Sequence, residues 1–244
     1  MIVQKDMPYG SGSAHRLDLY TPHQPSGNLL LYFHGGGLEG GDKSDLNLMP
    51  EMLTDQGITL VSANYRMYPE ARFPDYVDDC ARAAAWAWQY AQSQASPLGL
   101  YIGGSSAGAY LAMMLFADNR YLARYGLNPW SASGYLFDAG QPTTHFNVLR
   151  ERGWDPRLVR LDEAAPIFHI TQDFPAGRPL PRLLILLADH DMPNRLEQNR
   201  LLMGTLLHFG YPQDHIGFRV MQNAAHCQYT GGADFCRQVV DFVG

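Results

Sequence analysis

Cysteine is scarce in this sequence, with only Cys80, Cys227 and Cys236 among 244 residues. An odd number of cysteines without regular spacing is not typical of a disulfide framework or of a zinc site. We therefore expect unpaired thiols, which behave as small apolar side chains. A bridge between Cys227 and Cys236 stays open as the alternative.

Long apolar runs and runs of basic residues are also lacking. No apolar stretch approaches the roughly 18 residues that a membrane-spanning helix needs. Residues 1–13 show no charged stretch followed by an apolar core, as a secretory signal would. The 18 Lys and Arg are outnumbered by 24 Asp and Glu, for a formal charge of -6. We expect a cytoplasmic protein with no membrane span and no nucleic-acid partner, and homo-oligomerisation stays open.

Metal and nucleotide motifs are missing as well. The pattern H-E-x-x-H does not occur, and no cluster of cysteine and histidine has the spacing of metal ligands. The phosphate-loop pattern G-K-[ST] is not present either. We therefore expect no metal and no cofactor.

What the sequence does contain is an alternation of short apolar runs with helical patterns. Its composition, 46% hydrophobic and 17% charged, is that of an ordinary globular domain. Continuous apolar runs suit strands buried on both faces of a parallel sheet. Helices between them imply a three-layer α/β domain, with helices on both faces of a mostly parallel central sheet. The expected strands cover 29–33, 58–63, 98–102, 133–137, 183–187 and 216–221, and the expected helices cover 76–92, 106–117, 195–209 and 232–243.

Two segments depart from this alternation. Residues 15–20 tend to alternate polar and apolar side chains, which suits an edge strand with one wet face. Residues 138–181 hold several prolines and mixed charge but no clear strand, and such a stretch is too long for a plain connection. It is either a small lid over the carboxyl edge of the sheet or a helix with long flanks. We expect a single domain over 1–244, with a lid-like insertion at about 139–181.

The strongest local motif is Gly-Ser-Ser-Ala-Gly at 104–108, which fits G-x-S-x-G with Ser106 at its centre. An expected strand precedes it and an alanine-rich helix follows. On such a tight turn the central serine projects above the sheet edge, at the positive end of a helix. Ser106 is therefore the predicted nucleophile. Ser105 is the alternative, but in its register it has a glycine on only one side.

A second motif, His-Gly-Gly-Gly at 34–37, follows the expected strand 29–33. Consecutive glycines let the backbone turn sharply and direct N–H groups into a cleft, as a developing oxyanion requires. The amides of Gly36 and Gly37, together with that of Ala107 just after the nucleophile, are the predicted oxyanion hole.

A serine nucleophile needs a base, and the base needs an orienting acid. In this arrangement the expected order is Ser, then Asp or Glu, then His. The run 183–187 ends in a turn that holds both Asp189 and Asp191. Asp191 is preferred because it lies a few residues past the strand end, and Asp189 stays open as the alternative. His226 follows the run 216–221 and precedes the last helix, so it is the predicted base.

The remaining histidines are assigned lesser roles. His34 is expected to order the glycine loop through hydrogen bonds, and His190 is too close to the acid to be the base. His145 and His169 fall in the insertion and are candidates for substrate contact, because lids close over such sites. The others are expected to be solvated or locally bonded: His15, His23, His208 and His215.

Together these motifs resemble those of the α/β-hydrolase fold, and within it the hormone-sensitive-lipase-like esterases. The glycine triplet is similar to the family's oxyanion motif, and 104–108 to its nucleophile elbow. Ala-Asp-His-Asp at 188–191 is similar to its acid turn, in which the last aspartate serves, and this favours Asp191. The block 64–70, Asn-Tyr-Arg-Met-Tyr-Pro-Glu, is also similar to a family block, with the later residues Phe73, Pro74, Asp78 and Trp86.

The chain also departs from that family. Ser105 stands where the family more often has Asp or Glu, and Met192-Pro193 replaces the usual Pro-Leu after the acid. The loop before His226 has Asn223 in place of the usual Gly. Only residues 1–27 precede the glycine-loop strand, so the chain resembles a compact member with a reduced lid, of the acetyl-esterase or kynurenine-formamidase-like kind.

The sequence thus predicts a serine hydrolase. The resemblance to compact family members implies a small-molecule substrate that is a carboxylic ester with a short acyl group. An arylformamidase or a small peptidase on the same residues is the first alternative, because amide cleavage needs the same machinery. A non-catalytic protein that binds a small ligand in the cleft is the second.

Overall fold

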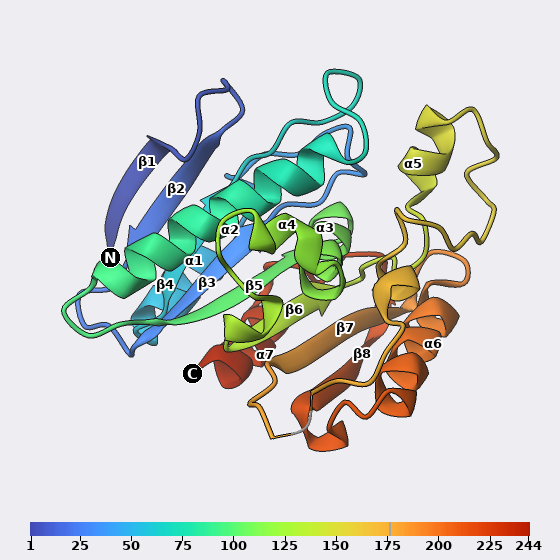
Figure 1. Cartoon of the computed structure of the whole chain (residues 1–244). Coiled ribbons are helices and arrows are strands. Elements are labelled where there is room, and N and C mark those ends of the chain that lie inside the picture. The colour runs from blue at the N-terminus through green and yellow to red at the C-terminus, as the bar shows by residue number, and fades with distance from the viewer. Residues whose placement is uncertain (176) are drawn as a thin grey trace.

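A computed structural model describes residues 1–175 and 177–244. At its centre is an eight-stranded sheet with the strand order β1-β2-β4-β3-β5-β6-β7-β8 (Figure 1). β2 pairs antiparallel with β1 and with β4, and the other neighbouring strands pair in parallel. The strands are β1 (Ile2–Pro8), β2 (Arg16–Thr21), β3 (Asn28–Phe33), β4 (Thr59–Ala63), β5 (Gly99–Ser105), β6 (Gly134–Asp138), β7 (Arg182–His190) and β8 (Ile216–Ala225).

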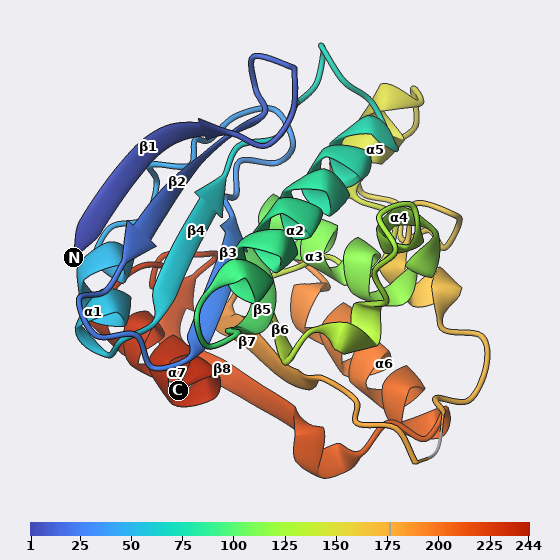
Figure 2. The same ribbon diagram turned by 60° about the vertical axis from the view of Figure 1, so that its left-hand side comes forward.

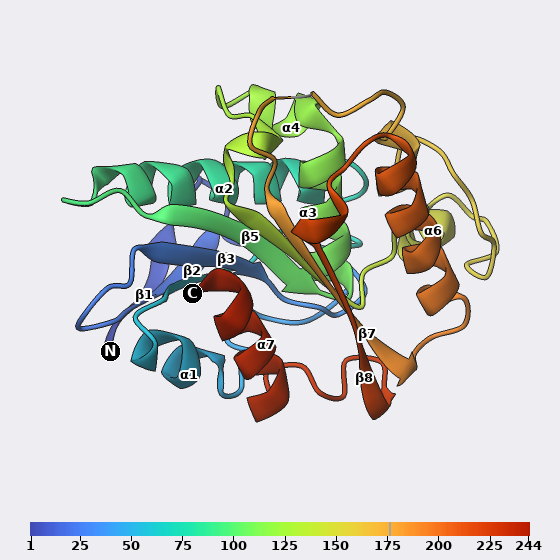
Figure 3. The ribbon, with the colours of Figure 1, turned by 90° about the horizontal axis from the view of Figure 1, so that it is seen from below.

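The sheet is covered on both faces, because successive side chains of a strand point to opposite sides. In β3, Leu29, Leu31 and Phe33 belong to one buried apolar cluster, whereas Leu30 and Tyr32 belong to a second. The first cluster lies beneath α2 (Asp75–Ser93), α3 (Ala107–Ala117), α4 (Asn119–Ala123) and α6 (Arg195–His208). The second lies beneath α1 (Met49–Asp55) and α7 (Ala233–Val243), on the other side of the sheet (Figure 3). The predicted three-layer α/β fold is confirmed.

The N-terminal strands correct one prediction. The segment 15–20, expected at the edge of the sheet, forms β2 and lies between β1 and β4 (Figure 2). Its polar residue Asp18 is buried and bound by the Nζ atom of Lys43 at 2.8 Å, so it does not mark a wet face. The true edge strand, β1, has mostly exposed side chains and is held by backbone pairing with β2.

The chain leaves the sheet between β6 and β7, in the segment predicted as an insertion. Its described residues form α5 (Phe146–Glu151) and the short 3₁₀ helix Pro166–His169, and they contain no strand. α5 stands at the periphery of the molecule (Figure 1). Ala176, which falls within the predicted insertion, lies outside the described residues.

Three further expectations from the sequence concern a membrane-spanning helix, a metal site and a disulfide bridge. No helix in the described part of the chain is long and apolar enough to cross a membrane. Over residues 1–175 and 177–244, no three metal-ligating side chains gather as a metal ion would need. All three cysteines are free thiols, so a bridge between Cys227 and Cys236 is not formed.

Candidate active site

Ser106 occupies the sharp turn between β5 and α3, with φ 52° and ψ -112°. A positive φ is rare for a residue with a side chain, and neighbouring contacts must hold it. Gly104 and Gly108 allow the turn, since an added Cβ would lie 2.4 and 2.0 Å, respectively, from the carbonyl oxygen of Phe33. The close approach of β3 thus explains why residues on either side of the serine must be small.

The structure brings the three predicted catalytic residues together. Ser106 Oγ lies 2.8 Å from His226 Nε2, and His226 Nδ1 lies 2.6 Å from Asp191 Oδ1. The Asp191 side chain is only 2% exposed, whereas that of His226 is 24% exposed. Because an ionised carboxylate can only accept hydrogen bonds, Nδ1 of His226 donates to Asp191 and Nε2 is left to accept the serine proton.

Asp191 is held in its ionised form. Burial raises the pKa of its carboxyl group, but hydrogen bonds from His226 and from the amides of Met192 and Ala188 more than offset this. The net pKa lies below the usual aspartate value, so the carboxylate is charged at neutral pH.

Asp189, the alternative acid, faces different partners. Its carboxylate accepts hydrogen bonds from the amides of Asn223 at 2.8 Å and Ala224 at 3.0 Å, which lower its pKa to about 2. The Asp189 side chain, at the end of β7, therefore holds the end of β8 in place just before His226. Asn223 has φ 55°, a left-handed conformation that asparagine tolerates better than most residues, which accounts for its place where the family usually has glycine.

The glycine loop lies on one wall of the same site. Gly36 and Gly37 have φ values of 107° and 67°, and a Cβ on Gly36 would lie 2.0 Å from the carbonyl oxygen of Gly40. Among the hydrogen bonds of the described residues, none is donated by the amides of Gly36, Gly37 or Ala107. Within the described residues, those three N–H groups are therefore unpaired. Asn147 of α5 donates a hydrogen bond to the carbonyl oxygen of Gly37 and fixes that turn.

His34 supports this loop from behind. Its Nδ1 donates to the carbonyl oxygen of Gly35 at 2.7 Å, and its ring stacks on Tyr65 with 4.5 Å between centroids. Burial lowers the pKa of His34, so the ring is neutral at physiological pH. These are the loop-ordering contacts that the sequence suggested.

Ser105, the alternative nucleophile, points to the interior instead. It is 3% exposed, its hydroxyl donates to Asp138, and its Oγ lies 2.6 Å from the Tyr32 hydroxyl. The carboxylate of Asp138 also accepts hydrogen bonds from Tyr229 at 2.6 Å and Thr230 at 2.7 Å. Asp138 therefore connects the nucleophile turn to the loop after His226.

A cleft of about 480 Å³ opens in front of Ser106. Its walls include Tyr32, Phe146 and Met192, together with the glycine loop. Cys227 also lines it, with Sγ 3.6 Å from His226 Nε2. The volume is in the range of small-molecule sites, which runs from about 300 to 1,000 Å³.

The two histidines of the insertion do not line this cleft. His145 is fully buried behind Phe146, with 4.4 Å between the ring centroids. His169 lines a separate cavity of about 170 Å³ with Trp130 and Phe174. The expectation that either contacts a substrate beside Ser106 therefore finds no support in the geometry.

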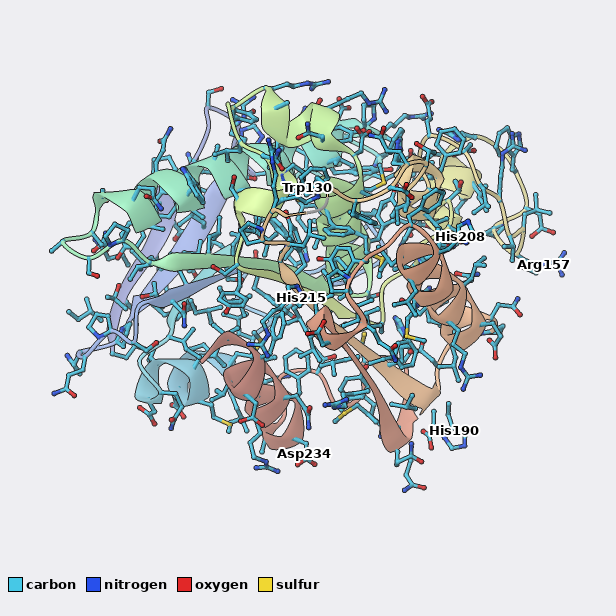
Figure 4. The ribbon with its side chains drawn as sticks, turned by 60° about the horizontal axis from the view of Figure 1, so that its bottom comes forward. Trp130, Arg157, His190, His208, His215 and Asp234 are labelled. Carbon is cyan, nitrogen blue, oxygen red and sulfur yellow. The ribbon has the colours of Figure 1, made fainter. Side chains whose placement is uncertain are left out.

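Other histidines mostly follow expectation, with one exception. His190 and His208 are exposed and lie at the surface (Figure 4), His23 is exposed, and His215 is half-buried. His15, however, is buried, and its Nε2 lies 2.9 Å from the Asp79 carboxylate, far away in sequence. Asp79 also binds Arg66 in bidentate fashion, so this aspartate, and not its neighbour Asp78, anchors the 64–70 block.

Several residues at the site were not found from the sequence. Asp138 ends the strand that lies next to β5, so the rule that carboxyl ends of parallel strands share one edge could have placed it near Ser106. Phe146 and Asn147 follow a segment without periodicity, and no sequence signal brings them to the glycine loop. Cys227 is adjacent to His226 in sequence and could have been named.

Comparison with known proteins agrees with this architecture. A family described as alpha/beta hydrolase fold matches residues 30–130. Kynurenine formamidase of Salmo salar is 29% identical over 133 residues, covering 54% of this chain and 44% of that protein. Ethyl acetate hydrolase of Pseudomonas putida is 36% identical over 107 residues, covering 40% of this chain and 32% of that protein. The match thus spans less than half the length of each of these relatives.

A solved structure extends the likeness over the whole chain. A truncated carbohydrate esterase from gut microbiota superimposes with a TM-score of 0.77 at 16% identity, covering 100% of this chain and 95% of that one. At this identity the likeness shows the fold alone. The α/β-hydrolase fold is confirmed, and so is the resemblance to esterases and formamidases of this family.

Proposed function

We propose that this α/β hydrolase is a serine hydrolase that cleaves a carboxylic ester with a short acyl group. The observation that carries the proposal is the continuous chain from Ser106 through His226 to Asp191, with distances of 2.8 and 2.6 Å. A hydroxyl within hydrogen-bond distance of an imidazole that a buried carboxylate orients is the arrangement that activates serine for acyl transfer.

The reaction proceeds through an acyl-enzyme. Ser106 Oγ attacks the ester carbonyl carbon while its proton passes to His226 Nε2, and the proton then goes to the departing alcohol as its C–O bond breaks. A water molecule next gives a proton to His226 and attacks the acyl carbon, which releases the acid and restores the serine hydroxyl. Asp191 stays ionised and stabilises the imidazolium.

The amides of Gly36, Gly37 and Ala107 are the proposed donors to the tetrahedral oxyanion. Their support is the positive φ of both glycines, which turns the loop at the cleft wall, and the absence of competing acceptors among the described residues. One donor of this kind typically stabilises the transition state by about 2.7–4 kcal/mol.

The short acyl group is proposed on two grounds. The name of one relative, ethyl acetate hydrolase, refers to an acetate ester. Phe146, carried by the 139–181 segment that we propose acts as a lid, places a bulky side chain in the wall of the cleft in front of Ser106. A formamide is the second candidate substrate, because other relatives are named kynurenine formamidase.

Steady-state hydrolysis of p-nitrophenyl esters from acetate to dodecanoate tests the proposal. We expect kcat/KM to fall steeply beyond butyrate, and Ser106→Ala to lose about 10³-fold or more of kcat. Equal turnover of dodecanoate and acetate would refute the short-acyl preference, and full activity of Ser106→Ala would refute the mechanism.

Formanilide and peptide anilides, assayed in parallel, separate the second candidate from the first. Formanilide turnover that exceeds ester turnover would assign the enzyme to formamides on the same residues. If folded wild-type protein turns over none of these substrates, the enzymatic proposal is wrong.

A further inference from the structure

A second cavity, of about 280 Å³, adjoins the cleft in front of Ser106. The two share Phe146 and Met192 as lining residues, so the second cavity lies next to the cleft at these two side chains. The cavity lies between the 139–181 segment and the first turn of α6. We call it the Arg195 cavity, after the charged residue at its base.

Arg195 is an unusual lining residue because it is 3% exposed and has no acidic partner among the described residues. One guanidinium nitrogen donates to the carbonyl oxygen of Ala139 at 2.6 Å, and another lies 3.4 Å from Gln141 Oε1 and 3.6 Å from Met192 Sδ. All three acceptors are neutral. A guanidinium carries five N–H donors, so part of its hydrogen-bonding capacity is unused.

A buried cation without a counter-ion is costly, and burial indeed lowers the pKa of Arg195. The acid that acts on it most strongly is Asp191, whose carboxylate is already bound by His226. Arg195 therefore places a positive charge beside the cleft in front of Ser106, with no acidic partner among the described residues.

Gln198 adds a second donor on the same helix. It is 9% exposed and lines the cavity, and its Oε1 accepts a hydrogen bond from Thr143 at 3.2 Å. This contact orients the amide, and no acceptor among the described residues takes its Nε2. Two buried donors thus meet at one cavity.

The other lining residues do not offset this charge. Arg157 is a second cation, which binds Asp155 at the outer edge of the molecule (Figure 4). The remaining walls include Pro156, Leu158 and Val159, and none of the described residues that line the cavity is acidic. The cavity therefore combines apolar walls with the positive charge of Arg195.

We propose that the Arg195 cavity is a substrate subsite for a carboxylate, so that the preferred ester carries an acidic group at the end of a short apolar arm. The inference rests on the proposed hydrolase function. A carboxylate between Arg195 and Gln198 would complete the donors that the protein leaves open, and charge-assisted bonds of this kind are the strong ones.

Matched substrate pairs test this subsite. On the acyl side, mono-p-nitrophenyl glutarate is compared with its neutral methyl ester. On the alcohol side, 4-carboxyphenyl acetate is compared with 4-carbamoylphenyl acetate. We expect kcat/KM to favour the acidic member of one pair by about tenfold or more, as a charged hydrogen bond in a buried site implies. The pair that responds tells which side of the ester enters the cavity.

Substitutions of Arg195 and Gln198 test whether the preference for the acidic substrate arises in this cavity. Arg195→Gln is expected to abolish the preference for the acidic member. Gln198→Glu keeps the acceptor for Thr143 and places a carboxylate beside Arg195, and this variant is also expected to abolish the preference. It provides an independent test if Arg195→Gln fails to fold. Arg200→Gln removes an exposed positive charge from the same helix and is the matched control, expected to keep the preference.

The outcomes separate the two proposals. Turnover of the neutral esters with no preference in either pair, or a preference that survives both cavity variants, would overturn the subsite and leave the hydrolase intact. Failure of wild-type protein to turn over any of the four esters would overturn the hydrolase proposal first.

Discussion

At the scale of single residues, Asp189 and Asp191 are separated by a single residue but bind different partners. The carboxylate of Asp191 is bound to the imidazole of His226, whereas that of Asp189 is bound to two backbone amides of β8. One aspartate orients the proposed base, and the other holds the strand that leads to it.

This difference predicts unequal effects of neutral substitutions. Asp191→Asn should lower kcat on the order of 10⁴-fold, since an amide stabilises the wrong tautomer of His226. Asp189→Asn should stay within about tenfold of wild type, since the Asp189 side chain binds backbone amides of β8 and not the imidazole of His226. Steady-state kinetics on p-nitrophenyl acetate measures both variants, and the reverse ranking would make Asp189 the acid.

At the scale of elements, Asp79 joins three parts of the chain. From α2 it binds Arg66, which follows β4, and His15, which precedes β2. Burial raises the pKa of the Asp79 carboxyl, but the hydrogen bonds from Arg66 and His15 more than offset this and hold the pKa below the usual value. The folded chain therefore binds fewer protons at Asp79 than the unfolded chain does.

Asp79→Asn should accordingly destabilise the protein at neutral pH. We expect the free energy of unfolding to fall by about 2–3 kcal/mol, less than for a fully buried pair because Arg66 is partly exposed. The stabilisation is present above the unfolded pKa of about 3.9 and is lost as the pH falls through the lower folded value. Urea denaturation should thus show a difference between wild type and variant at pH 7 that shrinks toward pH 3.

Asp78→Asn is the matched control for that experiment. Asp78 binds Arg124 at the surface, where an ion pair contributes at most about 1 kcal/mol. A loss at Asp78 as large as that at Asp79 would contradict the assignment of the buried anchor.

At the scale of the whole molecule, the parallel strands of the sheet can be predicted from the sequence. Both faces of these strands are buried, so each strand is a continuous apolar run. The run 183–187 lies within β7, and the Gly-x-Ser-x-Gly turn joins β5 to α3 as expected. β1 is not predicted, because its exposed side chains give no hydrophobic pattern. α1 is not predicted, because its seven residues are too few to show the periodicity of a helix.

The residues of the site likewise divide into those that the sequence can predict and those that it cannot. Residues on turns next to core strands, such as Ser106 and Asp191, can be predicted because strand ends and small-residue spacing mark them. Phe146 and Arg195 cannot, because their places depend on how the 139–181 segment packs against α6, which no local pattern encodes.

The measurement that tests the central claim most directly is labelling by a fluorophosphonate probe, read by intact mass and peptide mapping. We predict one adduct per chain, on Ser106, no adduct on Ser106→Ala, and normal labelling of Ser105→Ala, because the hydroxyl of Ser106 contacts His226 whereas that of Ser105 contacts Asp138. An adduct on Ser105, or a folded wild-type protein that stays unlabelled while it turns over esters, would contradict the assignment of Ser106 as the nucleophile.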